Sequence, residues 1–105
     1  MQFLDICRNP SNPPRGNTPY LIIVQGDYVQ VHSTRVVVPL MTVDAVSPII
    51  KGGLMPEFTV EGLRVVMVTP ELAGISISEI GPVVAKAQDR HHDVRRAIDI
   101  LTGDF

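Results

Sequence analysis

Apolar residues follow a helical spacing over the last quarter of the chain, from Pro82 to Phe105. They recur at steps of three and four, which places them on one face of an α-helix: Val84, Ala87, His91, Val94, Ile98 and Leu101. Pro82 suits the first turn of such a helix, and Gly103 can end it in a left-handed conformation. The pattern predicts one amphipathic helix starting at Pro82 and a short tail ending in the apolar Phe105.

Short apolar, β-branched runs separated by turn residues fill the earlier part of the chain. They predict strands at residues 2–7, 20–25, 35–40, 54–60, 63–69 and 75–77, and leave a short strand at 28–31 open. Glu61-Gly62 is a two-residue hairpin signal. Pro39 lacks an N–H group, so we expect it near the end of its strand, or at an edge or bulge. Short connections predict a mostly antiparallel sheet, a small barrel or sandwich with one covering helix.

Two segments are predicted to be loops. Residues 8–19 contain four prolines in twelve positions, which excludes a helix or a strand ladder there. Residues 41–51 are weakly periodic and contain Pro48, so we expect a loop with room for one helical turn. A long polar loop in so small a chain is often used for binding.

Composition and charge indicate a single-domain protein and argue against a nucleic-acid binder and a membrane protein. With 105 residues and 45% hydrophobic content, the chain can form one core in a single domain, residues 1–105. A net charge of −2 argues against a nucleic-acid binder that acts by general electrostatic attraction. No segment approaches the roughly 18 apolar residues of a membrane span, and the start lacks the basic region of a signal peptide. We therefore expect a cytoplasmic protein, with Cys7 as a buried small hydrophobe.

Candidate catalytic groups are sparse. His32 precedes two hydroxyl residues, but neighbours on an extended chain point apart and form no dyad. His91 and His92 are adjacent, whereas two metal ligands on one helix face need a spacing of three or four, so we expect a partly buried His91 and an exposed His92. No catalytic residue, metal ligand or cofactor is predicted. The residues themselves indicate a small β-rich domain that works by binding.

Five blocks in register nevertheless resemble one family, the CcdB toxins of plasmids and chromosomes. The blocks are Met1-Gln2-Phe3, residues 20–27 (YLIIVQGD), residues 35–40 (RVVVPL), residues 67–73 (MVTPELA), and a C-terminal block with Ile80-Gly81, Val84-Ala85 and residues 93–99 (DVRRAID). They cover essentially the whole chain in order. The resemblance implies a mainly β fold, a small antiparallel SH3-like barrel with a C-terminal α-helix, which is shared with the MazF and Kid ribonuclease toxins.

The same resemblance implies a function without chemistry of its own. A CcdB-type toxin is a homodimer that binds the A subunit of DNA gyrase and traps the complex of gyrase with cleaved DNA. A CcdA-like antitoxin neutralises it, and the toxin–antitoxin complex represses its own operon, so DNA is contacted only through that complex.

Family positions that face gyrase correspond here to Tyr28, Val29, Asp99 and the tail residues Gly103, Asp104 and Phe105. Typical members end in Trp-Gly-Ile, and those last residues carry gyrase binding, whereas this chain ends in Thr-Gly-Asp-Phe. Phe105 is therefore the tail's one aromatic side chain.

Antitoxin contact is expected in the two loops, at Arg8, Asn9, Arg15, Met41 and Asp44.

Two alternatives stay open at this point. One is a CcdB-like homologue with weak or altered action on gyrase. The other is a ribonuclease toxin of the MazF-like fold, which would need a basic groove that faces RNA. The sequence pI of about 5.8 argues against that second alternative.

Overall fold

The structure is a computed structural model that describes residues 1–29, 33–50 and 52–103. Its strands are β1 (Asp5–Arg8), β2 (Tyr20–Ile23), β3 (Thr34–Thr42), β4 (Glu57–Val60), β5 (Leu63–Met67), β6 (Ala73–Ser76) and β7 (Val83–Lys86). Four short 3-10 turns join them: η1 (Val43–Ala45), η2 (Thr69–Glu71), η3 (Ile77–Glu79) and η4 (Gln88–Arg90). The α-helix is α1 (His91–Leu101).

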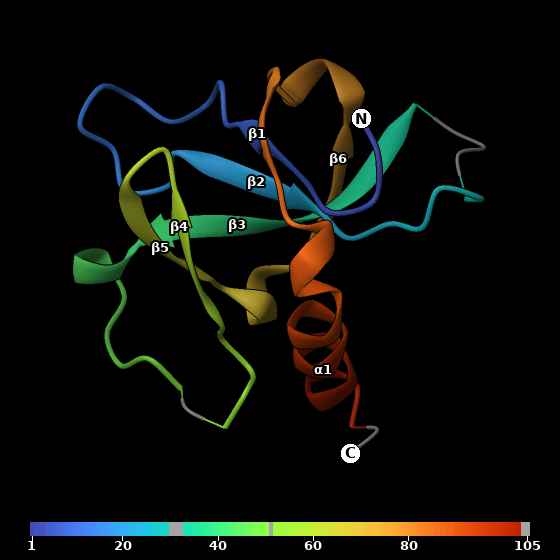
Figure 1. The fold of residues 1–105 in the computed structure, drawn as a ribbon. Helices are drawn as coiled ribbons and strands as arrows, with labels where there is room; N and C mark the ends of the chain where they lie inside the picture. Colours follow the sequence, from blue (N-terminus) through green and yellow to red (C-terminus); the bar gives the residue numbers. More distant parts are fainter. Residues whose placement is uncertain (30–32, 51, 104–105) are drawn as a thin grey trace.

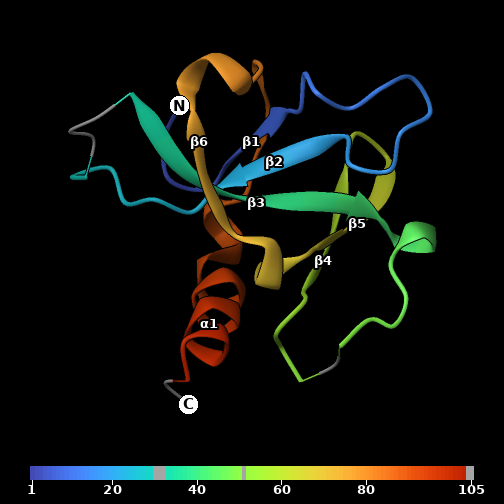
Figure 2. The ribbon, with the colours of Figure 1, turned by 180° about the vertical axis from the view of Figure 1, so that it is seen from behind.

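The strands form one antiparallel sheet in the order β4-β5-β3-β2-β1-β7, with β6 paired to the first half of β3. Strand β3 is the centre of this sheet because it pairs with β2, β5 and β6. The sheet curls into a half-barrel, and α1 extends from one end of it (Figures 1 and 2). This architecture confirms the predicted fold class, a mainly β antiparallel fold with a C-terminal helix.

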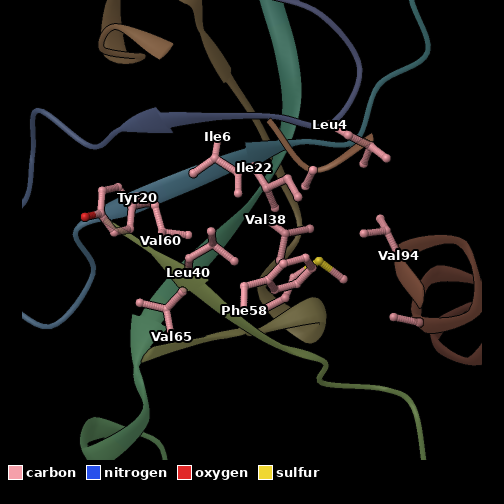
Figure 3. Packing of buried hydrophobic residues seen from close by; sticks show 13 residues of the cluster. Leu4, Ile6, Tyr20, Ile22, Val38, Leu40, Phe58, Val60, Val65 and Val94 are labelled. Atoms are coloured by element: carbon pink, nitrogen blue, oxygen red, sulfur yellow. The ribbon is translucent and has the colours of Figure 1, made fainter. Parts of the chain in front are cut away.

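The concave face of the sheet holds the main core. Aliphatic side chains of β1, β2 and β3 point toward Phe58, Val60 and Val65, and Val94 of α1 lies at the side of this group (Figure 3). A smaller cluster on the other face contains Cys7, Leu21, Ile23, Val37 and Ile80. Within the described residues, no helix has the length and apolar character that crossing a membrane requires.

The predicted hairpin at Glu61-Gly62 is confirmed. Both residues have positive φ, +52° and +79°, as a two-residue turn between twisted strands requires. They connect β4 to β5 with Val60 opposite Leu63. The other predicted strands exist with shifted ends, and the helical turn allowed in residues 41–51 is η1. Of the open segment 28–31, Tyr28 and Val29 lie outside any strand, and the remainder falls outside the described residues.

The predicted start of the helix at Pro82 is wrong, because α1 begins at His91. Val83–Lys86 instead pairs antiparallel with β1, which would otherwise end the sheet with an unpaired edge. Arg8 N–H donates to Pro82 O (3.0 Å) and Ala87 N–H donates to Leu4 O (2.9 Å), so the pairing satisfies backbone groups on both segments. The β-branched Val83 and Val84 suit a strand, and this tertiary pairing outweighs the helical spacing.

Pro39 was expected near the end of its strand, or at an edge or bulge; it lies inside β3, at a point where one edge of the strand has no paired partner strand. Val68 N–H donates to Pro39 O (3.0 Å), which places the proline nitrogen on the edge of β3 that faces away from β2. On that edge the partner changes from β6, which pairs as far as Val37, to β5, which pairs from Leu40. The missing N–H group therefore falls in the gap between two partner strands.

The first strand begins later than predicted because the carboxylate of Asp5 folds the N-terminus back. Asp5 is buried, and it accepts hydrogen bonds from Gln2 N–H (2.7 Å), Lys86 Nζ (2.8 Å) and Gln88 Nε2 (3.2 Å). The preceding Leu4 has φ +66°, which reverses the chain between Gln2 and β1. Burial alone would raise the pKa of Asp5, but the hydrogen bonds from Lys86, Gln2 and Gln88 outweigh it and lower that pKa below 3.8.

We expect Asp5→Asn to reduce the free energy of unfolding by about 2 kcal/mol, because buried hydrogen bonds to a charged acceptor are lost. The lowered pKa means that this contribution is complete above the pKa of the unfolded chain and disappears as the pH falls through the folded value. Urea unfolding between pH 7 and pH 3 should therefore show a smaller loss of stability in the variant than in the parent. Asp93→Asn is the control, since Asp93 pairs with Arg90 on the surface (2.6 Å). Equal pH dependence in Asp5→Asn and the parent would contradict this role of Asp5.

Candidate functional site

The turn after β2 presents two apolar side chains to solvent. Tyr28 is fully exposed and Val29 is 56% exposed, the two most exposed large hydrophobic residues in the described part of the chain. Val29 N–H donates to Gly26 O (3.0 Å), which closes the turn. Packing does not explain these two residues, because neither side chain contributes to a core cluster.

The backbone of this turn is held in place by hydrogen bonds, although the side chains of Tyr28 and Val29 are exposed. Phe3 N–H donates to the Asp27 carboxylate (2.8 Å), and Val36 N–H donates to Oε1 of Gln25 (3.1 Å). The side-chain amide of Gln25 also donates to Val29 O. The two exposed side chains thus stand on a turn that is tied to the N-terminus and to β3, which reduces the entropy cost of binding a partner.

The second predicted gyrase-facing group lies at the end of α1. Asp99 is half-buried on this helix, and Gly103 has φ +83°, the left-handed conformation expected for a residue that ends a helix. Gly103 N–H donates to Ile100 O (3.2 Å), and Thr102 N–H donates to Ile98 O (3.0 Å). The predicted contacts Asp104 and Phe105 lie outside the described residues.

The structure does not bring these two groups together within one chain. In both views the turn after β2 lies beside the sheet, whereas the C-terminal end of α1 projects away from it (Figures 1 and 2). A partner that touched both groups would have to extend along one side of the molecule.

The segments predicted for antitoxin contact do lie side by side. Thr42 N–H, next to Met41, donates to Asn17 O of the proline loop (2.9 Å). Asn9 shapes that loop, since its amide donates to Thr18 O (3.0 Å) and its Oδ1 accepts from Ser11 N–H (3.1 Å).

The predicted residues differ in exposure along this surface. Arg15, at φ +64°, and Asp44, in η1, are exposed. Met41 is half-buried and packs against a third apolar cluster that contains Met55, Val66 and Val68. The exposed positions are therefore the better candidates for contact with a partner.

Arg8 takes part in a contact that the sequence did not reveal. Its Nη2 donates to Oε2 of Glu61 (3.0 Å), and the Tyr20 hydroxyl donates to Oε1 of the same carboxylate (2.7 Å). Burial, followed by this hydrogen bond to Glu61, raises the pKa of Tyr20 to about 12. Glu61 thereby joins the β4–β5 turn to the start of the proline loop. The sequence marked Glu61 only as part of a two-residue hairpin turn and gave no signal for this contact.

A groove of about 230 Å³ runs between the proline loop and β6. Half of its lining is apolar, namely Leu21, Val37, Pro39, Ala73 and Ile75, and the other half consists of Asn9, Ser11, Thr18, Glu71 and Glu79. The charged groups in this lining are the two carboxylates, which make the groove acidic. An acidic groove does not suit the phosphate backbone of RNA.

The chemistry of the described residues is limited. They contain no cluster of three or more His, Cys, Asp or Glu side chains that could hold a metal ion. The prediction for the histidine pair is confirmed: His91 is half-buried with its ring edge-on to Phe3 (centroids 5.6 Å apart), and His92 is exposed. His32 lies outside the described residues.

The chain matches the model of a known protein family. The family model described as CcdB protein matches residues 2–103. The match spans β1 to the end of α1 and includes the exposed turn, the proline loop and Gly103.

Proposed function

Because the chain belongs to the CcdB family, whose members are toxins of CcdAB systems, we propose that it binds the A subunit of DNA gyrase and traps gyrase on cleaved DNA. The family is generally non-enzymatic, and the poison we propose needs no nucleophile. It needs an apolar surface that fits a protein partner and excludes water from the contact.

The observation that carries this proposal is the exposed pair Tyr28 and Val29 on a fixed turn. These are the positions that the family resemblance assigns to gyrase. A fully exposed tyrosine has no role in packing, whereas tyrosine is among the residues enriched at binding hot spots. Asp99 and the tail from Gly103 to Phe105 form the second part of the proposed contact.

We further propose that a CcdA-like antitoxin neutralises the chain and that their complex represses the operon, contacting DNA through the antitoxin. The adjoining proline loop and η1 region are the proposed antitoxin surface, with Arg8, Asn9, Arg15, Met41 and Asp44. The hydrogen bond between Thr42 and Asn17 supports this assignment, because it makes one continuous surface of two segments distant in sequence. We propose a homodimer as the working form, acting in the cytoplasm where gyrase is found.

Incubation of the purified protein with gyrase and supercoiled plasmid tests the central proposal. We expect linear, protein-linked DNA to accumulate, and expression without antitoxin to stop growth. Normal supercoiling at high protein concentration, with no cleaved complex, would contradict gyrase poisoning. Cleavage of RNA by the same preparation would support the ribonuclease alternative instead.

Removal of Phe105 tests whether the tail takes part. If its ring replaces the aromatic anchor of typical family members, we expect the truncated chain to need about thirtyfold more protein for the same cleavage, equivalent to about 2 kcal/mol. Phe105→Tyr is the matched control and should keep most of the activity. Unchanged cleavage after truncation would mean that the tail is not part of the contact.

A further inference from the structure

Phe3 and Leu4 connect the N-terminus to the exposed turn after β2. Phe3 N–H donates to Oδ1 of Asp27 (2.8 Å), the residue before Tyr28 in that turn. Leu4 N–H donates to Ile23 O (2.7 Å), at the end of β2 where the turn begins. Both N–H groups therefore face the segment that carries the proposed gyrase contact.

The carbonyl groups of the same two residues face the opposite side. Leu4 O accepts from Ala87 N–H (2.9 Å), and Phe3 O accepts from Nε2 of Gln88 in η4 (2.8 Å). The Phe3 ring also lies edge-on to His91, the first residue of α1 (centroids 5.6 Å apart). Residues 3–4 therefore form a bridge between the turn and the start of α1, which we call the N-terminal bridge (Figures 1 and 2).

The N-terminal bridge uses two side chains in place of neighbouring strands. Because β1 begins at Asp5, Phe3 lies before the ladder, and the Asp27 carboxylate and the Gln88 amide supply its acceptor and its donor. Leu4 has φ +66°, outside the extended conformation in which successive backbone groups alternate between the two sides of a strand. Both carbonyls can therefore face the segment that leads into α1.

We propose that Asp27 and Gln88 are positioning residues of the gyrase contact, which act through the N-terminal bridge to hold the exposed turn in a fixed place relative to α1. The inference rests on the proposed function, because the turn carries Tyr28 and Val29 and the helix carries Asp99. These groups lie apart within one chain, so a partner that contacts both requires a fixed separation between them. Fixing that separation before binding lowers the entropy cost of the complex.

The two positioning side chains can be replaced without opening the core. Asp27 and Gln88 are both exposed, so their replacement removes no buried apolar surface. Gln88 also donates to Oδ1 of Asp5 (3.2 Å), but that carboxylate keeps its bonds from Gln2 N–H and Lys86 Nζ. Substitution of either residue therefore changes the bridge with little change in stability.

Substitution at each end of the bridge tests the proposal. Asp27→Ala removes the acceptor, and Gln88→Met removes the donor while keeping a side chain of similar length. We expect each variant to need about tenfold more protein than the parent for the same DNA cleavage by gyrase. Because both changes break the same bridge, the double variant should need little more than either single variant, instead of the roughly hundredfold increase that independent effects would give.

A second measurement follows the turn without gyrase. Val29 N–H donates to Gly26 O (3.0 Å), so its hydrogen exchange, measured by NMR, reports opening of the turn. We expect Asp27→Ala and Gln88→Met each to raise this exchange rate about threefold to tenfold, the equivalent of one hydrogen bond. An effect of Gln88→Met on Val29 requires the bridge, since Gln88 belongs to η4 and not to the turn.

Two variants serve as controls. Asp27→Asn keeps the acceptor oxygen and should behave as the parent, which separates positioning from a direct contact between the Asp27 charge and gyrase. Asp89→Ala removes an exposed carboxylate next to Gln88, leaves the four hydrogen bonds of the bridge intact, and should also behave as the parent. Urea unfolding checks that every variant folds.

Additive effects in the double variant, or exchange of Val29 in Gln88→Met at the parent's rate, would overturn the positioning role. Asp27→Asn as weak as Asp27→Ala would assign the Asp27 charge to direct contact with gyrase and likewise contradict the proposal. If the parent does not trap cleaved DNA, the proposed poisoning is wrong, and the exchange rates of Val29 still confirm or overturn the coupling of the turn to η4.

Discussion

Replacement of both Tyr28 and Val29 by alanine is expected to abolish most of the gyrase poisoning while leaving the fold intact. Tyr28 is fully exposed, so its removal costs no packing in the free protein. At an interface, however, a buried aromatic anchor contributes about 2 kcal/mol or more, and the adjacent valine adds to the same contact. We expect the concentration needed for half-maximal DNA cleavage to rise by about a hundredfold.

The control is Val83→Ala, which shortens another exposed valine (41% exposed) on the edge strand β7. It should poison gyrase like the parent, and the unfolding midpoints of all three proteins in urea should agree closely. If the double variant traps cleaved DNA at the parent's concentration, the turn after β2 is not the gyrase contact, even though the chain is a family member.

The largest expected effect on stability comes from Leu40→Ala. Leu40 is completely buried on β3, the strand on which the sheet is centred, and it shares its cluster with Tyr20, Phe58 and Met67. Truncation of such a leucine removes apolar area and leaves a cavity, at a cost of about 2–5 kcal/mol. That is a large part of the roughly 5–15 kcal/mol that stabilises a typical domain.

Leu63→Ala makes the same chemical change at a site that is 39% exposed, and it should cost about 1 kcal/mol or less. Urea unfolding measures the stability of both variants. A shift of the unfolding midpoint, with an unchanged dependence of the unfolding free energy on urea concentration, would identify a loss of stability rather than a change of the unfolded state. Equal shifts in the two variants would contradict the position of Leu40 at the centre of the core.

Elements whose conformation is set by a few neighbouring residues could be predicted from the sequence. The β4–β5 hairpin was predictable because Glu61-Gly62 supplies two positive φ angles between apolar runs. The strand β7 was not predictable, because Val84 and Ala87 continue the three- and four-residue spacing of the apolar residues in α1. The sequence pattern alone therefore indicated a helix at these two positions. Their conformation is decided by β1, nearly eighty residues earlier, whose open edge takes Val83–Lys86 as its partner.

The features of the candidate site also depend on contacts between distant segments, which the sequence did not reveal. The exposed turn was identified by family resemblance, and exposure of Tyr28 could not be derived from its position between two apolar runs. The adjacency of the proline loop to Met41 depends on one long-range hydrogen bond, Thr42 to Asn17.

The buried Cys7 gives the chain an internal reporter. It is the one cysteine in the sequence, and it is completely buried in the cluster on the convex face of the sheet. Burial, with the negative charge of Asp5 close by, raises the pKa of its thiol and suppresses the reactive thiolate. The rate at which a thiol reagent labels the native protein therefore measures how often β1 separates from its neighbours. Antitoxin or gyrase, once bound, should slow that labelling in proportion to the stability that each partner confers.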